Sequence, residues 1–177
     1  MSNLPRPQHG DHADYYTRYV DLVPDGDIVE ILGSQMGETL ALLQAVSAER
    51  ETFSYAPGKW TVREVIGHLI DVERMFVFRA MNMTRADGVE LPGMDPDEWA
   101  RNSNAGRRPL DDLAAEWASL RRAHVHLFAT LSPDAGERRG VASGMEFTVR
   151  SFPWIIAGHE LWHRECLIRD YGVTAAG

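Results

Sequence analysis

The spacing of apolar residues constrains the fold of this 177-residue chain more than any other feature of the sequence. Four stretches carry apolar side chains three and four positions apart, which places those side chains on one face of a helix. These stretches run from about Asp27 to Ser47, from Thr61 to Phe76, from Leu110 to Leu131 and from Ser151 to Asp170. No strand pattern of comparable length competes with them. The sequence therefore predicts an all-α fold, a four-helix bundle in which every helix buries its apolar face.

The connections between these helices differ in length. About a dozen residues join the first two helices, whereas roughly 26 residues separate the second helix from the third. The long connection contains Pro92-Gly93 and Pro96 and permits a crossover, with a short extra helix predicted near Asp97 to Arg101. Residues Val141 to Val149 are expected to form a small hairpin or an ordered loop.

Composition excludes several classes of partner. The chain is expected to form one domain over 1–177 with a flexible N-terminal segment at 1–14. A formal net charge of -8 and scattered basic doublets argue against nucleic-acid binding. The N-terminus lacks a signal-peptide pattern and no apolar run approaches the ~18 residues that cross a membrane, so a cytoplasmic location is expected. The lone Cys166 excludes an intrachain disulfide and fits a reducing compartment.

The fourth helix contains the pattern H-E-x-x-H at His159-Glu160-Leu161-Trp162-His163. Histidines four residues apart project from one helix face, and both lie within the apolar stripe, where metal coordination satisfies one nitrogen of each ring. Zinc proteases with this motif take a third ligand from downstream, and only fourteen residues follow His163, none of them histidine. The sequence therefore favours His159 and His163 as two ligands of one metal ion, without the active site of a zinc protease. The residues alone leave the third ligand open among His68, His124, Cys166 and a carboxylate, although ~10 Å of helical rise from His159 disfavours Cys166.

Two segments together resemble a known family. Lys59-Trp60-Thr61-Val62-Arg63-Glu64-Val65-Ile66-Gly67-His68-Leu69, followed by Ile155-Ile156-Ala157-Gly158-His159 and His163, is similar to the DinB-like (YfiT-type) superfamily of metal-binding four-helix bundles. The resemblance covers nearly the whole chain. It implies that His68 joins His159 and His163 in a three-histidine site for one divalent metal ion, zinc or nickel, and that the chain forms a homodimer.

The resemblance also implies a metal-dependent hydrolase of the YfiT type or a transferase of a low-molecular-weight thiol, acting on a small-molecule substrate. Three imidazoles leave a coordination position open, which a metal-bound water or a substrate thiolate can occupy. Glu64 and Asp71, one helical turn on either side of His68, are weak candidates for acid/base or supporting roles, and Glu160 stays unassigned. The alternative is a non-catalytic metal- or ligand-binding bundle of the stress response.

Overall fold

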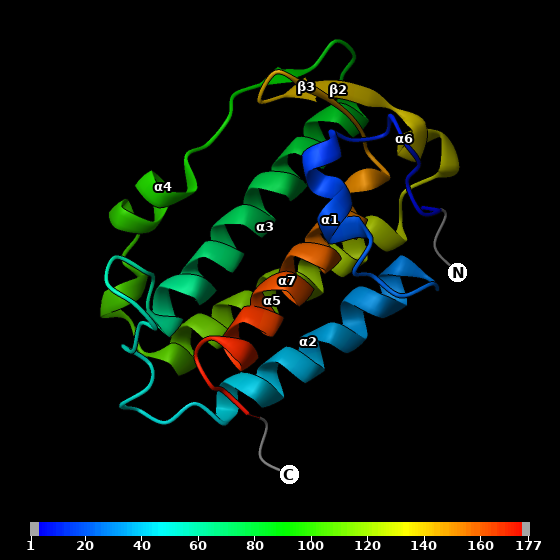
Figure 1. Cartoon of the computed structure of the whole chain (residues 1–177). Helices are drawn as coiled ribbons and strands as arrows, with labels where there is room; N and C mark the ends of the chain where they lie inside the picture. The colour runs from blue at the N-terminus through cyan, green and yellow to red at the C-terminus, as the bar shows by residue number, and fades with distance from the viewer. Residues whose placement is uncertain (1–3, 175–177) are drawn as a thin grey trace.

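Four long helices form the body of the molecule in a computed structural model that describes residues 4–174 (Figure 1). They are α2 (Ile28–Gln44), α3 (Val62–Arg85), α5 (Leu110–Ala129) and α7 (Ser151–Arg169). Each of these helices packs against two others, so that their cyclic order around the core is α2, α5, α3 and α7. All four predicted helices are present, and each begins within one residue of its expected start.

Short-range hydrogen bonds explain where two of these helices begin. The Asp27 carboxylate accepts from the backbone N–H of Val29 at the start of α2. Thr61 and Glu64 form a complete capping box at the start of α3, as the sequence predicts. A capping box satisfies two of the N–H groups that a helix leaves unpaired at its first turn. This fixes the beginning of the helix that carries His68.

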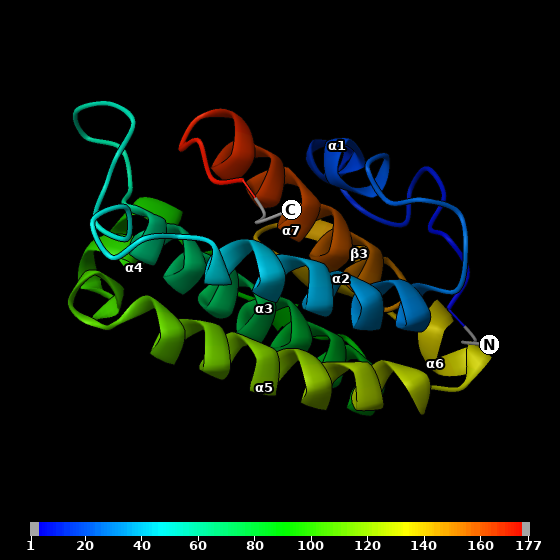
Figure 2. The ribbon, with the colours of Figure 1, turned by 90° about the horizontal axis from the view of Figure 1, so that it is seen from below.

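The connection between α3 and α5 returns the chain along the length of the bundle. Figures 1 and 2 show that α3 and α5 therefore run in the same direction, while α2 and α7 run in the opposite one. The connection contains the short helices α4 (Pro96–Asn102) and η2 (Ala105–Arg107), both of which contact α3. The predicted crossover and the predicted extra helix are both confirmed.

A small sheet amends the prediction of a purely helical fold. Strands β2 (Arg139–Ala142) and β3 (Met145–Thr148) form an antiparallel hairpin, and β1 (Glu90–Leu91) pairs in parallel with β2. Ser143 and Gly144 connect the hairpin with φ values of 55° and 72°. Positive φ at both positions is what a type I′ turn requires, and this turn type matches the twist of the two strands. Segments this short carry too few residues for a strand pattern to be recognised in sequence.

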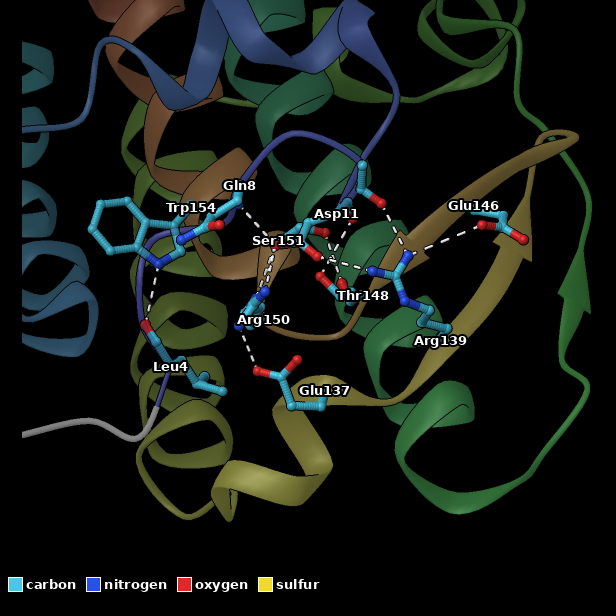
Figure 3. Close-up of polar contacts among 11 residues, drawn as sticks. Leu4, Gln8, Asp11, Glu137, Arg139, Glu146, Thr148, Arg150, Ser151 and Trp154 are labelled. Atoms are coloured by element: carbon cyan, nitrogen blue, oxygen red, sulfur yellow. Dashed lines mark hydrogen bonds and ion pairs between the residues drawn. The ribbon is translucent and has the colours of Figure 1, made fainter.

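The N-terminal segment differs from the expectation of a flexible tail, because residues 4–14 pack on the bundle and the hairpin (Figure 3). The buried Asp11 carboxylate accepts hydrogen bonds from Arg150 and Arg139, and the Leu4 carbonyl accepts one from the Trp154 indole. His12 in the same segment is also buried. A prediction from polar composition misses this packing because the partners lie over 125 residues away in sequence. Residues 1–3 lie outside the described part of the chain.

The N-terminal segment leads into η1 (Asp14–Tyr16) and α1 (Thr17–Val20), and α1 packs against α7. A fifth short helix, α6 (Pro133–Glu137), precedes the hairpin. No helix within residues 4–174 combines the length and the apolar character needed to cross a membrane.

Candidate metal centre

Three histidines from two helices meet at the side of the bundle. The Nε2 atom of His159 lies 3.2 Å from Nε2 of His68 on α3 and 3.2 Å from Nε2 of His163, one turn further along α7. One ligand nitrogen from each of the three rings lies within 4.8 Å of the other two. Two imidazoles bound at about 2.1 Å to a tetrahedral zinc ion place their nitrogens about 3.4 Å apart. The spacing of these nitrogens therefore fits a shared divalent ion.

The other proposed third ligands lie elsewhere. His124 on α5 points its Nδ1 atom at Glu73 Oε1, 3.0 Å away, and belongs to a different cluster. Cys166 is half-buried and lines a neighbouring hollow together with His163, but its sulfur does not belong to the cluster of ligand atoms. Burial raises the pKa of the Cys166 thiol, with only partial opposition from Arg169. Of the alternatives that the residues left open, the structure brings only His68 to His159 and His163.

Close contact between α1 and α7 determines which side chains pack against the His159 ring. Gly158 precedes His159, and a Cβ atom at Gly158 would stand only 1.9 Å from the backbone oxygen of Tyr19. Glycine thus allows α1 to lie directly on α7. The Tyr19 ring then packs edge-on against His159, with ring centroids 5.3 Å apart, and against Trp162 at 5.8 Å.

Burial keeps the three imidazoles neutral. It lowers the pKa of His68 to about 4, with slight opposition from Asp97, and the pKa of His163 to about 3, with a further contribution from His68. Burial, together with the two neighbouring imidazoles, holds the pKa of His159 well below its ordinary value. A neutral imidazole has a lone pair free for a metal ion, so the site is ready to bind a cation at physiological pH.

The three histidines line one end of a pocket of about 540 Å³. Its walls are mainly aromatic and methionine side chains, among them Tyr16, Trp60, Phe76 and Met75. Trp60, the residue before the α3 cap, packs on His68 with ring centroids 4.6 Å apart. A concave, largely apolar pocket with a few polar groups converging in it is typical of small-molecule sites.

Neither weak acid/base candidate faces this pocket. The Glu64 carboxylate accepts hydrogen bonds from the backbone N–H and the hydroxyl of Thr61, so it serves the capping box. Asp71 lines a neighbouring hollow and lies 3.9 Å from Arg74. Burial raises the pKa of Asp71, and Arg74 opposes that change. The sequence-based assignment of these two carboxylates to the site gains no support from their positions.

A buried charged cluster that the sequence did not predict lies directly behind His159. Arg121 on α5, which is 1% exposed, donates hydrogen bonds to Glu73 at 2.9 Å and to Glu160 at 2.5 Å. Thr39 on α2 donates to the other oxygen of Glu160 at 2.6 Å. The sequence does indicate that Arg121 is buried, because Arg121 follows Trp117 by four residues and so continues the buried stripe of α5. Its neighbour Arg122 is exposed, so only half of that basic doublet is a surface feature.

The molecule is thus a helical bundle, and its three-histidine cluster opens into a pocket and forms a candidate metal centre. A sequence profile of the DinB superfamily matches residues 32–167, and the chain belongs to this superfamily. This confirms the resemblance seen in the sequence.

Two relatives are similar to the chain. A curated protein of Geobacillus kaustophilus (strain HTA426), provisionally named a metal-dependent hydrolase, is 30% identical over 105 residues. That match covers 54% of this chain and 59% of the relative, less than two thirds of its length. The solved structure of YfiT from Bacillus subtilis, titled "a probable metal-dependent hydrolase with an unusual four-helix bundle topology", superposes with a TM-score of 0.69 at 16% identity. The superposition covers 95% of this chain and 94% of YfiT, and it shows a shared fold.

Proposed function

We propose that His68, His159 and His163 hold one divalent metal ion, zinc or nickel, and that the chain is a metal-dependent hydrolase of a small molecule. The observation that carries this proposal is the convergence of three neutral imidazole nitrogens within 4.8 Å at the end of an apolar pocket. Imidazole is a good ligand for either metal. The name of the Geobacillus relative favours hydrolysis over other uses of such a site.

Three protein ligands leave room for a further ligand on the pocket side, which distinguishes a reactive site from a structural one. A bound ion supplies Lewis acidity, which polarises a carbonyl group and makes water a stronger acid. The chain's own residues provide the setting for this chemistry. The aromatic walls make the pocket largely apolar, and Tyr19 and Trp60 pack on His159 and His68 and thereby limit rotation of their rings.

The first test measures metal content. Protein purified from its host should contain about one zinc or nickel ion per chain by elemental analysis. The variants His68→Ala, His159→Ala and His163→Ala should each lose most of it. His126→Ala, which alters an exposed histidine on α5, should retain all of it. Full retention by the three site variants would refute the metal site.

The second test separates hydrolysis from the other functions. Metal-loaded protein is assayed with activated esters and amides, and separately with bacillithiol or mycothiol plus an electrophile. Hydrolysis that disappears in His163→Ala and on chelation supports the proposal. Thiol transfer without hydrolysis would instead make the chain a thiol S-transferase. Metal binding with no turnover across both panels would make it a metal- or ligand-binding bundle.

A further inference from the structure

Arg79 on α3 is a buried cation without an acidic partner. Its side chain is 2% exposed, and its Nη2 atom donates to the Pro92 carbonyl at 3.0 Å and to the Ser143 hydroxyl at 2.8 Å. No carboxylate within residues 4–174 forms an ion pair with it. Its Nη1 atom makes no hydrogen bond of ordinary geometry with the described residues, and the Tyr16 phenol lies close enough to interact with the guanidinium.

The contrast with Arg121 shows how unusual this arrangement is. Both arginines are almost fully buried, but Arg121 has two carboxylates, Glu73 and Glu160, against its guanidinium. Fully buried arginines are normally paired, because removing a charge from water is unfavourable unless an opposite charge or several hydrogen bonds replace it. An unpaired buried guanidinium therefore indicates that the partner is a ligand rather than a residue of the chain.

Arg79 lies at the opposite end of the pocket from the histidines. His68 and Arg79 are eleven residues apart on α3, three helical turns, and so lie on the same face about 16 Å apart along the axis. Arg79 is the one charged side chain among the described residues that line this pocket.

Flexible side chains line the pocket together with Arg79. Met75, Met94 and Met145 line the same pocket, and Tyr16 lies close enough for its phenol to interact with the guanidinium. Methionine side chains change conformation easily, so a ligand can reach Nη1 by displacing them. The tyrosine hydroxyl can then donate a second hydrogen bond to the same ligand.

We propose that this pocket recognises a small carboxylic acid, with its carboxylate on Arg79 Nη1 and its apolar body along the aromatic and methionine walls. The second half of the proposal rests on the proposed function: the carbonyl to be hydrolysed lies at the histidine end of the same pocket. A single guanidinium with one free nitrogen suits a monoanion. A dianionic phosphate would require further cationic groups, and the described lining residues provide none.

Binding of two matched probes tests the first half without metal or turnover. Phenylbutyrate and its neutral amide have the same shape, and calorimetry measures their affinity for metal-free wild-type protein, so that the acid cannot bind to a metal. We expect the acid to bind about tenfold more tightly or better, because it makes a charge-assisted hydrogen bond that the amide cannot. Arg79→Met should abolish this preference, whereas Arg85→Met, an exposed arginine at the end of the same helix, should leave it unchanged.

Equal affinity for acid and amide, absence of binding by both, or a preference that survives Arg79→Met would overturn the inference. If Arg79→Met fails to fold, a crystal structure of the wild-type protein with phenylbutyrate decides, because the carboxylate must lie within hydrogen-bond distance of Arg79. If the probes show no Arg79-dependent preference but the protein retains its metal, the Arg79 proposal is refuted and the proposed metal centre is not. Conversely, an Arg79-dependent preference in protein that never binds metal would refute the proposed function alone.

Hydrolysis tests the second half. Metal-loaded protein should hydrolyse the half-ester of a dicarboxylic acid at lower KM than the corresponding diester. Arg79→Met should raise KM for the half-ester about tenfold with a smaller change in kcat, because Arg79 binds the part of the substrate that does not react. Equal KM values for the two esters would show that the carboxylate does not bind at Arg79 during turnover.

Discussion

Replacing Gly158 with alanine tests the close contact on which the candidate site depends. The added Cβ atom would lie 1.9 Å from the Tyr19 backbone oxygen and 2.3 Å from its carbonyl carbon. Ordinary contacts of this kind are about 3.5 Å long, so α1 must retreat from α7 by about 1.5 Å. The obstruction is backbone rather than the end of a flexible side chain, so no rotamer change relieves it. Because Tyr19 packs on His159, the retreat would also disturb the metal centre.

The magnitude follows from two opposing effects. Overpacking a well-filled contact costs about 1–3 kcal/mol, and a displacement of this size belongs at the upper end. Alanine is a better helix former than glycine by about 1 kcal/mol, which offsets part of that loss. We expect the free energy of unfolding to fall by about 1–2 kcal/mol, and Tm to fall by about 2–4 °C for each kcal/mol in a chain of this size.

Gly37→Ala provides a matched control for this prediction. Gly37 lies inside α2, and nothing stands within 4 Å of a Cβ atom built there. The same chemical change should therefore raise stability by about 0.5–1 kcal/mol. Urea unfolding of both variants and the wild type measures the difference, and elemental analysis reports the metal content of each. If Gly158→Ala matches or exceeds the wild type in stability, the contact between α1 and α7 is not as close as described.

Two further predictions concern buried charges. The pKa of Asp11 lies below its ordinary value: burial would raise it, but the Gln8 N–H and Arg150 outweigh burial. The carboxylate thus stabilises the fold above the pKa that it has in the unfolded chain, and this contribution is lost as pH falls through the lower folded pKa. The Tm difference between the wild type and Asp11→Asn should therefore shrink from pH 7 to pH 3, and a constant difference would contradict the ion pair. Arg121→Met should lower the free energy of unfolding, measured by urea denaturation, by about 3–5 kcal/mol, because it leaves two buried carboxylates without their cationic partner. The exposed Arg122→Met should change it by less than about 0.5 kcal/mol, and equal effects would exclude a structural role for the cluster.

Much of the helical fold follows from local sequence. A helix needs only apolar residues at regular spacing and a start signal, and both are contained within about twenty consecutive residues. The capping box at Thr61 illustrates this, since both of its partners lie within one turn. The crossover follows in the same way from the length of one connection.

The features that the sequence did not predict depend on distant partners. Strand β1 is two residues long and is defined only by its pairing with β2, about fifty residues later. Residues 4–14 read as a polar tail, yet Asp11 is buried because Arg139 and Arg150 reach it from the hairpin and the start of α7. The position of Arg79 at the pocket is likewise visible only once Pro92 and Ser143 are seen beside it. Spacing alone contains no information on such contacts.

The candidate site lies between these two cases. Spacing placed His159 and His163 on one face of a helix, but it could not choose among ligands on other helices. Packing makes that choice: α3 presents His68 to the pair, whereas the Nδ1 atom of His124 is held against Glu73. The family resemblance implied His68 as the third ligand because it carries information about packing that a single sequence lacks.

Glu160 shows how the same motif can serve different purposes. In metalloproteases that carry H-E-x-x-H, the glutamate faces the metal and acts as a base. Here Glu160 is buried in the bundle core, where Thr39 on α2 and Arg121 on α5 both donate to it. These two contacts tie α7 to the adjacent helix α2 and to α5 across the core, one residue from a candidate ligand, and so limit the rotation of α7 about its own axis. The glutamate therefore orients His159 and His163 rather than reacting beside them, and any base for the proposed hydrolysis has to come from elsewhere in the pocket or from the substrate.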